Sequence, residues 1–280
     1  MAFDLQGKRV LVTGASSGLG AALAVGLAER GATIGLCARR QGHLDEVLAQ
    51  VQAHSPDSRA WAVDLGAIDG LDEFAARVLD DLGGLDVLVN NAGMPKRRWA
   101  WEHRADEIDD VLRVDLHSPI ALSLALLPAL DASGGRIVFI GSVAARLAPP
   151  SEAVYAAAKA GITAFAETLR VDLAVAGSPV GVHVVQPGVL DTPLFQLPDN
   201  DPSISDMEPL APAEIVGAVV SALDTGAAET FVPTWFQDIP PVKTGDLDGF
   251  LQGAAEYTTT RLHDLGRPLP ARPSEGTDRP

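Results

Sequence analysis

The chain is 280 residues long, carries a formal net charge of −16, and is 47% hydrophobic, which indicates a globular protein rather than a disordered or fibrous one. The acidic excess argues against a broad attraction to nucleic acid or to an anionic membrane, because both need clustered positive charge. The N-terminus lacks the apolar core of a secretory signal, and the longest apolar segment, residues 119–130, is too short to span a bilayer, so we expect a cytoplasmic protein with no membrane partner.

Short β-branched runs alternate with longer helical patterns along the chain, which is the βαβ rhythm. The expected strands are residues 9–13, 33–37, 59–63, 86–90, 136–140, 180–186 and 229–233. The expected helices between them are residues 18–30, 41–53, 68–82, 105–129, 151–176 and 212–224. Strands that are apolar at consecutive positions are typical of a parallel sheet covered on both faces. The sequence therefore predicts an α/β fold with a doubly wound, seven-stranded parallel sheet and helices on both faces.

No internal repeat or linker precedes residue 235, so we expect a single domain over residues 1–235. A C-terminal extension, residues 236–280, follows with one helix near 246–264, and its last residues, about 14 of them, have the composition of a disordered terminus. The one cysteine, Cys37, is expected to pack inertly in the second strand. The six histidines lie scattered, without metal-ligand spacing, so we expect no metal site.

Three glycines, Gly14, Gly18 and Gly20, follow the first strand in the stretch TGASSGLG, and a helical pattern begins at once. Glycine permits the tight turn and the close backbone approach that a pyrophosphate needs, and N–H groups of the helix N-terminus would meet its charge. Glycine-rich turns also join strands to helices for packing alone. The position between the first strand and the first helix favours nucleotide binding.

The second strand ends in CARR, where folds that prefer NAD place a carboxylate for the ribose hydroxyl. Ala38 occupies that position here, and Arg39 with Arg40 can pair with a 2′-phosphate through charge-assisted hydrogen bonds. The alternative is that both arginines are simply solvated. The pattern favours NADP over NAD.

Further polar residues end the third and fourth strands. Asp64 is a candidate acceptor for the adenine amino group, and Asn90, Ala92 and Gly93 are candidates to line the adenosine ribose. Each residue alone is compatible with ordinary loop chemistry, but ligands of doubly wound sheets collect beyond the carboxyl ends of the strands. Their position on adjacent strand ends therefore favours one shared binding site.

The stretch YAAAK places Tyr155 and Lys159 one helical turn apart, on the same face of a helix. Because a nearby cation favours the phenolate, we expect Lys159 to lower the pKa of Tyr155. Ser142 follows the fifth strand directly and can hold a substrate oxygen against Tyr155. The alternative is that Ser142 caps a turn, Tyr155 packs, and Lys159 is a solvated helix residue.

Five motifs follow one another along the chain: TGASSGLG, NNAG, GS at 141–142, YAAAK and PGVLDT at 187–192. With these motifs in this order, the chain resembles the short-chain dehydrogenase/reductase family over roughly residues 5–233. The resemblance implies a Rossmann fold and hydride transfer between a nicotinamide and a carbonyl or carbinol carbon. It implies that Tyr155 is the general acid/base, that Lys159 holds the ribose hydroxyls, and that Ser142 orients the reacting oxygen. It also implies a homodimer or homotetramer formed through the helices near 105–129 and 151–176.

The residues that match the motifs, together with the strand-end positions, form one predicted set of cofactor contacts. The set is Gly14, Ser16, Ser17, Gly18, Leu19, Gly20, Arg39, Arg40, Asp64, Leu65, Asn91, Ala92, Gly93, Tyr155, Lys159, Pro187, Gly188, Val189 and Thr192.

One residue departs from the family pattern. Where the family usually has an asparagine, in a helix after NNAG, this chain has Asp115 in RVDLHSP. The usual residue is thought to hold a water that links the lysine to solvent. A carboxylate can also accept from such a water and can pair with Lys159, and its added charge can alter the proton relay and the pKa of Tyr155. We therefore include Asp115 among the predicted catalytic residues.

Two segments bear on the substrate. The stretch 94–104 concentrates Lys96, Arg97, Arg98 and Arg104 with Trp99 and Trp101, which fits a carboxylate-bearing or flat apolar substrate, although exposed charged loops are commoner. Residues 193–212, rich in Pro, Asp and Ser, occupy the position of the family's substrate lid and are expected to be mobile. We expect an NADP-dependent oxidoreductase acting on a small-molecule carbonyl or alcohol, with a non-catalytic NADP-binding sensor or interaction module as the alternative.

Overall fold

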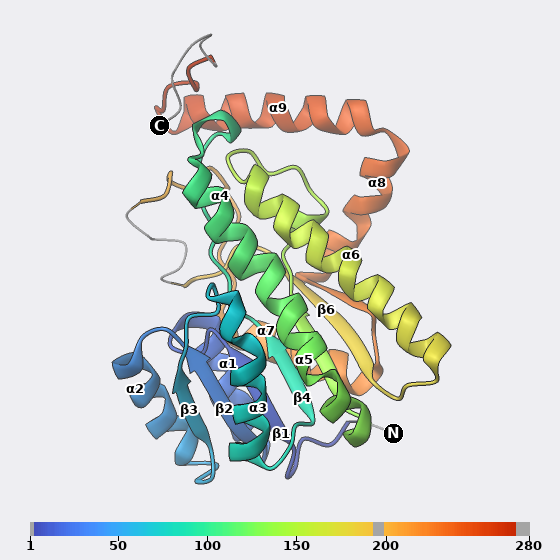
Figure 1. Ribbon diagram of the computed structural model, residues 1–280. Helices are drawn as coiled ribbons and strands as arrows, with labels where there is room; N and C mark the ends of the chain where they lie inside the picture. Colours follow the sequence, from blue (N-terminus) through green and yellow to red (C-terminus); the bar gives the residue numbers. More distant parts are fainter. Residues whose placement is uncertain (1–2, 193–198, 273–280) are drawn as a thin grey trace.

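The computed structural model describes residues 3–192 and 199–272, and one seven-stranded sheet forms its centre (Figure 1). Every pair of neighbouring strands is parallel, in the order β3-β2-β1-β4-β5-β6-β7. The strands are β1 (Arg9–Thr13), β2 (Thr33–Ala38), β3 (Arg59–Ala62), β4 (Val87–Asn90), β5 (Arg136–Ile140), β6 (Gly181–Pro187) and β7 (Glu229–Val232). The doubly wound Rossmann-type sheet predicted from the sequence is confirmed.

Helices cover both faces of this sheet. Helices α1, α2 and α7 pack on one face, and α3, α5 and α6 pack on the other. The helices are α1 (Gly18–Ala28), α2 (Gln41–Gln52), α3 (Leu71–Leu82), α4 (Ala105–Leu112), α5 (Ser118–Ser133), α6 (Ala153–Ala176), α7 (Pro212–Thr225), α8 (Ile239–Gly245) and α9 (Leu247–Asp264).

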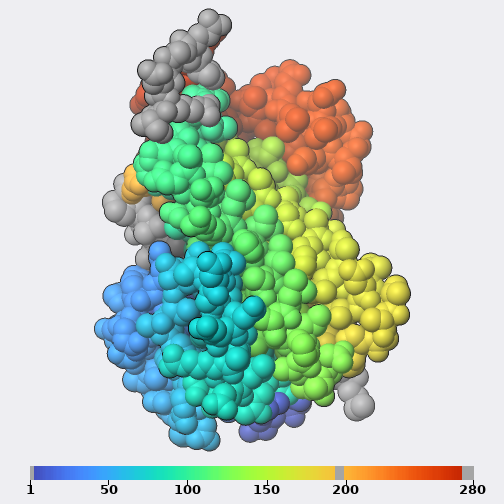
Figure 2. Space-filling model, in the orientation of Figure 1, coloured from blue at the N-terminus to red at the C-terminus, as the bar shows by residue number. Residues whose placement is uncertain are grey.

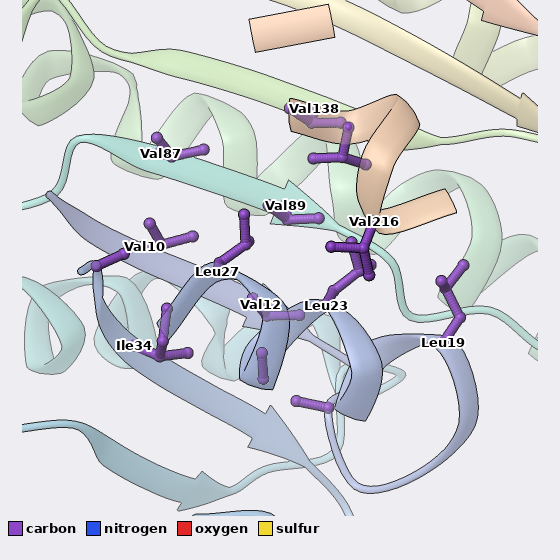
Figure 3. Close-up of a cluster of buried hydrophobic side chains, with 14 of the residues drawn as sticks. Val10, Val12, Leu19, Leu23, Leu27, Ile34, Val87, Val89, Val138 and Val216 are labelled. Carbon is purple, nitrogen blue, oxygen red and sulfur yellow. The ribbon is translucent and has the colours of Figure 1, made fainter. Parts of the chain in front are cut away.

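The apolar run of β1 supplies both layers of the core, because successive side chains of a strand point to opposite faces. Val10 and Val12 pack with α1 and α7, whereas Leu11 packs with α3 and α5. Figure 3 shows the first of these layers, where Leu23 of α1 and Val216 of α7 approach the strand. All five side chains are buried, so the carboxyl end of β1 has a rigid support.

The helix expected over residues 105–129 differs from the expectation in one respect that affects function. It is divided into α4 and α5 by a π-helical turn, Arg113–His117, and it ends later, at Ser133. A π turn contains one residue more than an α turn and changes which side chains face inward, and such turns occur frequently at functional sites. Here the turn contains Asp115, which is buried.

Within the described residues, Ala105–Ser133 is the one helix long and apolar enough to cross a membrane by length and composition. Core helices of soluble proteins pass the same test. In this chain Leu122 and Leu126 of α5 are fully buried against the sheet.

The C-terminal part contains the helix expected near 246–264, observed as α9, and one helix that was not expected, α8. Residues 199–211 have no helix or strand apart from an isolated bridge between Leu190 and Leu210. Residues 193–198 of the predicted lid and residues 273–280 of the predicted disordered terminus lie outside the described residues. The division into a domain over 1–235 and an extension stays a prediction.

Candidate active site

A cleft of about 350 Å³ opens at the carboxyl edge of the sheet, where the strand order reverses between β1 and β4. This is the position at which doubly wound sheets bind ligands. The predicted contacts that line it are Gly14, Ser16, Ser17, Gly18, Leu19, Gly20, Arg39, Arg40, Asp64, Leu65, Asn91, Ala92, Gly93, Ser142, Tyr155, Lys159, Pro187, Gly188 and Thr192. The cleft thus brings together residues from the ends of six strands and from α6.

The cleft is also lined by residues outside the predicted set of contacts. Most of them follow or end a strand, and Val114 belongs to the π turn; the full list is Ala38, Met94, Pro95, Val114, Ile140, Gly141 and Leu190. Three predicted residues do not line it, of which Asn90 is described below. Val189 uses its carbonyl oxygen to accept a hydrogen bond from the Leu210 backbone N–H, at 2.9 Å, and Asp115 lies behind Lys159.

The glycine turn is needed for close packing as well as for an open cleft. Gly14 has a φ of +67°, and a Cβ there would lie 2.8 Å from the Ala92 Cα. A Cβ at Gly20 would overlap the carbonyl oxygen of Gly14. The first turn of α1, which begins at Gly18, contains no acidic residue. The helix N-terminus therefore presents its N–H groups to the cleft without a competing negative charge.

Thr13 joins the glycine turn to the NNAG segment, a role that the motif alone did not reveal. Its Oγ1 atom accepts hydrogen bonds from the backbone N–H groups of Asn91 and Ala92, both at 2.9 Å. The Asn91 side-chain amide donates to the Thr13 carbonyl oxygen at 2.8 Å. These contacts fix the two loops that form opposite sides of the cleft.

Asn90 was predicted to line the adenosine ribose, and the structure contradicts this. Its side chain is buried and donates to the Ser123 hydroxyl of α5 at 2.9 Å, so it points into the core rather than the cleft. The reason is the strand alternation: Asn90 is still within β4 and faces α5, whereas Asn91 follows the strand.

Arg39 and Arg40 follow the end of β2, where folds that prefer NAD have a carboxylate. Arg40 donates from Nη2 to the Ser17 hydroxyl at 2.9 Å and to the Ser16 hydroxyl at 3.2 Å, so it lies over the glycine turn. Arg39 is exposed at the edge of the cleft, and within the described chain it makes no hydrogen bond or ion pair. At least one guanidinium group is thus free to meet an anion.

Tyr155 and Lys159 lie on the face of α6 that borders the cleft, and both are buried in the protein. The Lys159 Nζ atom is 5.6 Å from the centroid of the Tyr155 ring. Nζ donates to the Ile140 carbonyl oxygen at 3.1 Å, which ties the ammonium group to the end of β5. The alternative of a solvated Lys159 is therefore wrong, because only 4% of this residue is exposed.

Asp115 forms an ion pair with Lys159 in the interior of the protein. Its Oδ1 atom lies 3.1 Å from Nζ, and its Oδ2 atom accepts a hydrogen bond from the Met94 backbone N–H at 2.7 Å. The residue is 1% exposed. Burial raises the pKa of this carboxyl, while Lys159 opposes the rise.

Without cofactor, the pKa of Tyr155 is raised rather than lowered, contrary to the expectation from YAAAK. Burial of the phenol is the largest cause, and the negative charges of Asp115 and Glu152 raise the pKa further, whereas a side-chain hydrogen bond with Ser142 lowers it. The expectation drawn from YAAAK counted the ammonium group four residues away and not the burial of the phenol. The Asp115 carboxylate beside that ammonium offsets its field at the tyrosine.

Ser142 caps a turn and also faces the cleft, so the two roles weighed for it coexist. Its Oγ atom accepts from the Ala144 backbone N–H at 3.1 Å, which leaves the hydroxyl proton available. Its own backbone N–H donates to Gln186 Oε1 at 2.6 Å. Gln186, fully buried on β6, also donates to Glu229 at 2.9 Å, and sequence reasoning did not identify it.

The basic segment after β4 does not offer a free anion site. Lys96 and Arg98 both pair with Glu107 of α4, at 3.0 Å and 2.9 Å, and with Asp199, at 2.5 Å and 2.7 Å. Their charges hold the segment around Asp199 against α4. The idea that these cations bind a substrate carboxylate is therefore not supported.

No group of three or more His, Cys, Asp or Glu side chains in the described part of the chain is arranged to hold a metal ion. Cys37 is buried in β2, and burial raises the pKa of its thiol to about 12, so the thiol is uncharged and suited to packing only.

Residues 8–202 match the family model described as short chain dehydrogenase. The chain is 37% identical over 196 residues to a dehydrogenase/reductase SDR family protein 7-like from Drosophila melanogaster, a match that covers 68% of this chain and spans 60% of that relative's length. It is 30% identical over 235 residues to a 3-oxoacyl-(acyl-carrier-protein) reductase of Vibrio harveyi, covering 80% of this chain and 93% of the relative.

Among solved structures, a short chain dehydrogenase from Burkholderia cenocepacia in complex with NADP superimposes with a TM-score of 0.70 at 30% identity, covering 79% of this chain and 92% of the other. The sheet order and the cleft at its carboxyl edge agree with these matches. The chain belongs to the short chain dehydrogenase family of oxidoreductases.

Proposed function

We propose that this protein is an NADP-dependent oxidoreductase that interconverts a carbonyl and an alcohol, with Tyr155 as the general acid/base. The observation that carries the proposal is the convergence of Ser142, Tyr155 and Lys159 on the cleft that also contains the glycine turn. A nicotinamide dinucleotide fits this cleft chemically. Because Gly14 and Gly20 have no Cβ atom, the backbone of the turn can come close to a ligand, and Arg39 at the edge of the cleft makes no hydrogen bond or ion pair within the described chain. The names of the relatives, a dehydrogenase/reductase and a 3-oxoacyl-(acyl-carrier-protein) reductase, support the same reaction class.

The bound cofactor supplies or accepts a hydride, and the protein manages the accompanying proton. In carbonyl reduction the Ser142 hydroxyl donates a hydrogen bond to the substrate oxygen, and Tyr155 delivers its proton as that oxygen becomes an alkoxide. Lys159 has three N–H donors, of which one faces Ile140 and one faces Asp115. The third is available for the ribose hydroxyls of the cofactor.

The raised pKa of Tyr155 affects the two directions of the reaction differently. A phenol with a raised pKa remains protonated there and is ready to act as an acid. Alcohol oxidation requires the phenolate, which forms only at higher pH. We therefore expect carbonyl reduction to proceed at neutral pH and alcohol oxidation to need alkaline conditions.

Replacing Tyr155 by phenylalanine tests the mechanism. Tyr155→Phe removes the proton donor but keeps the ring, so NADPH consumption over a panel of aldehydes and ketones should fall at least about a hundredfold, while NADPH binding, followed by its fluorescence, is retained. Turnover equal to that of the unsubstituted protein would reject Tyr155 as the acid.

The cofactor preference has its own test. Arg39→Asp should weaken NADPH binding by about ten- to a hundredfold, the value of a lost charge-assisted hydrogen bond, and should leave NADH binding within about threefold. Arg59→Asp, the same charge change at the amino end of β3, is the control. If isothermal titration gives equal losses for both dinucleotides, the 2′-phosphate does not contact Arg39.

A second candidate is a non-catalytic NADP-binding module. The pairing of Asp115 with Lys159 favours it, because the carboxylate offsets the charge that would assist Tyr155. This candidate predicts NADPH binding without consumption over the whole carbonyl panel. Turnover that depends on Tyr155 excludes it.

We also propose a homodimer or homotetramer that acts on small molecules. The apolar side chains of Leu124 on α5 and of Val171 and Val175 on α6 are exposed. Figure 2 shows α5 and α6 next to each other on one face of the molecule. Sedimentation velocity of the protein and of Val175→Glu tests this, because a charge at an apolar contact should dissociate the oligomer.

A further inference from the structure

We propose that an apolar cavity beneath α9 holds the distal, hydrocarbon part of the substrate, so that the C-terminal extension selects carbonyl compounds with an alkyl chain or an apolar ring. The inference rests on the proposed function, since it concerns the substrate of that reaction. Helices α8 and α9 lie beyond the residues that match the family model. In Figure 1, α9 spans the top of the molecule, above the ends of α4 and α6.

The cavity has a volume of about 320 Å³, at the lower end of the range for small-molecule sites, about 300–1,000 Å³. One wall is α9, where Leu251, Ala254, Thr258 and Leu262 recur at helical spacing. Trp99 contributes an aromatic side chain from the segment after β4. The small side chains in the middle of the α9 wall leave the space open.

The chemistry of the walls specifies an uncharged, apolar ligand. None of the lining residues, all of which belong to the described chain, carries a charged side chain. The hydroxyls of Thr258 and Thr259 donate to the carbonyl oxygens of Ala254 and Ala255 within α9, at 2.6 Å and 2.9 Å. Both hydroxyl groups therefore already donate a hydrogen bond within the helix. An apolar ligand would leave no hydroxyl donor of these side chains without an acceptor.

Two chain segments connect this cavity to the catalytic cleft. Ala148 and Pro150 line the cavity and belong to the segment that joins Ser142 to Tyr155. Trp99 follows Pro95, a residue of the cleft, by four positions. The backbone N–H of Arg98 donates to the carbonyl oxygen of Ser151 at 2.8 Å, which keeps the two segments side by side. The cleft and the cavity are thus lined by residues of the same two neighbouring segments.

Polar contacts hold the extension to the segment between Ser142 and Tyr155 and to the described part of the predicted lid. Lys243 of α8 donates to the Arg146 carbonyl oxygen at 3.1 Å, on the Ser142–Tyr155 segment. On α9, the Tyr257 hydroxyl donates to Asp206 at 2.6 Å, within the predicted lid. Arg267 donates to the Ser203 carbonyl oxygen at 3.0 Å. These bonds make α9 a fixed wall rather than a loose tail.

A matched pair of substitutions on α9 tests the proposal. Thr259→Phe fills the cavity, whereas Thr260→Phe places the same ring at the next residue, which does not line the cavity and has the same internal hydroxyl bond, to Glu256 at 3.0 Å. Ala254→Phe is a second filling variant at a less exposed position. The readout is the ratio of kcat/KM for decanal to that for propanal, with NADPH.

Both filling variants should lower this ratio at least about tenfold without changing the rate with propanal, and Thr260→Phe should leave it unchanged. A second readout needs no turnover: displacement of the apolar dye Nile red by 1-decanol from the NADP complex should be seen in the unsubstituted protein and lost in the filling variants. An unchanged ratio overturns the proposal, whether or not dye binding is lost, because the cavity is then separate from the substrate path.

The same experiment separates failure of this inference from failure of the proposed function. If no aldehyde is reduced, the proposed function fails, and displacement by 1-decanol that is lost on filling still supports an apolar ligand site under α9. Absence of that displacement overturns the site as well. If Thr259→Phe changes the sedimentation coefficient and leaves the decanal-to-propanal ratio of kcat/KM unchanged, the lining of the cavity is a contact between copies of the chain. This result overturns the inference.

Discussion

At the scale of residues, the site depends on an ion pair that is removed from water. Lys159 and Asp115 are 4% and 1% exposed, and their charged atoms lie 3.1 Å apart. A buried charge is tolerated when it is paired and hydrogen-bonded, and here the Ile140 carbonyl oxygen and the Met94 N–H supply those bonds. The pair holds the ammonium group in position. Burial of the phenol raises the pKa of Tyr155 most, and the Asp115 carboxylate raises it further.

Asp115→Asn should separate these two effects. Removing the carboxylate takes away a charge that raises the pKa of Tyr155 and leaves the Lys159 charge uncompensated, so both changes lower that pKa. Reduction needs the protonated phenol, so its high-pH limb should move to lower pH. Oxidation needs the phenolate and should begin at lower pH as well.

The measurement is the pH profile of kcat/KM in both directions, with thermal unfolding as a check that the variant folds. Breaking a buried pair costs up to about 3–5 kcal/mol, so some loss of stability is expected. Profiles that coincide with those of the unsubstituted protein would mean that Asp115 is not electrostatically coupled to Tyr155.

Sequence reasoning placed Ser142, Tyr155 and Lys159 at one cleft because helical spacing and strand ends are local properties. It missed Gln186, whose contact with the Ser142 N–H depends on the register between β5 and β6. The direction of the Tyr155 pKa shift was also missed, because it depends on burial and on Asp115, forty residues earlier in the chain. Such effects arise only from the tertiary structure.

At the scale of elements, the turn from β1 to α1 is the most constrained connection in the site. Thr13 binds the backbone of the NNAG segment, and Gly14 and Gly20 lie where a Cβ would meet backbone or amide atoms. Backbone atoms cannot yield as a flexible side chain can. The packing that makes the turn tight therefore also shapes the cleft.

Gly20→Ala should destabilise the protein by about 1–3 kcal/mol, because the added methyl overlaps the Gly14 carbonyl, and it should weaken NADPH binding at the same turn. Gly42→Ala is the control, since nothing lies within 4 Å of its Cβ position in α2, and alanine there should be neutral or stabilising by up to about 1 kcal/mol. Denaturant unfolding measures both. A Gly20→Ala protein as stable as Gly42→Ala would contradict the packing described for the turn.

The strands and the long helices followed from periodicity, since all seven strands lie within a residue or so of their expected positions. The π turn at Arg113–His117 did not follow, because the residues on either side of it continue one apolar helical pattern. Helix α8 was not predicted because Pro240 and Pro241 are typical of a loop. Both residues lie in the first turn of the helix, where proline is tolerated. These departures lie where tertiary contacts or positional rules outweigh local composition.

At the scale of the whole molecule, the predicted site residues gather at one edge of the sheet. The cleft opens at the carboxyl ends of the strands, and the cavity under α9 is lined by residues of two segments that also border the cleft. The formal net charge of the whole chain is −16. It is compatible with binding of an anionic cofactor, because Arg39, Arg40 and a helix N-terminus provide positive charge at the cleft itself.

The central claim, that this molecule moves a hydride and a proton together in that cleft, is tested most directly by following the hydride itself. NADPH carrying deuterium at both hydrogen positions of the nicotinamide C4 is incubated with the protein and a carbonyl panel, and the alcohols are analysed by mass spectrometry. We predict one deuterium on the carbinol carbon of the product, and at least about a hundredfold less labelled alcohol from Tyr155→Phe at matched times. Tight binding of the labelled cofactor without transfer to any member of the panel would contradict the proposed function.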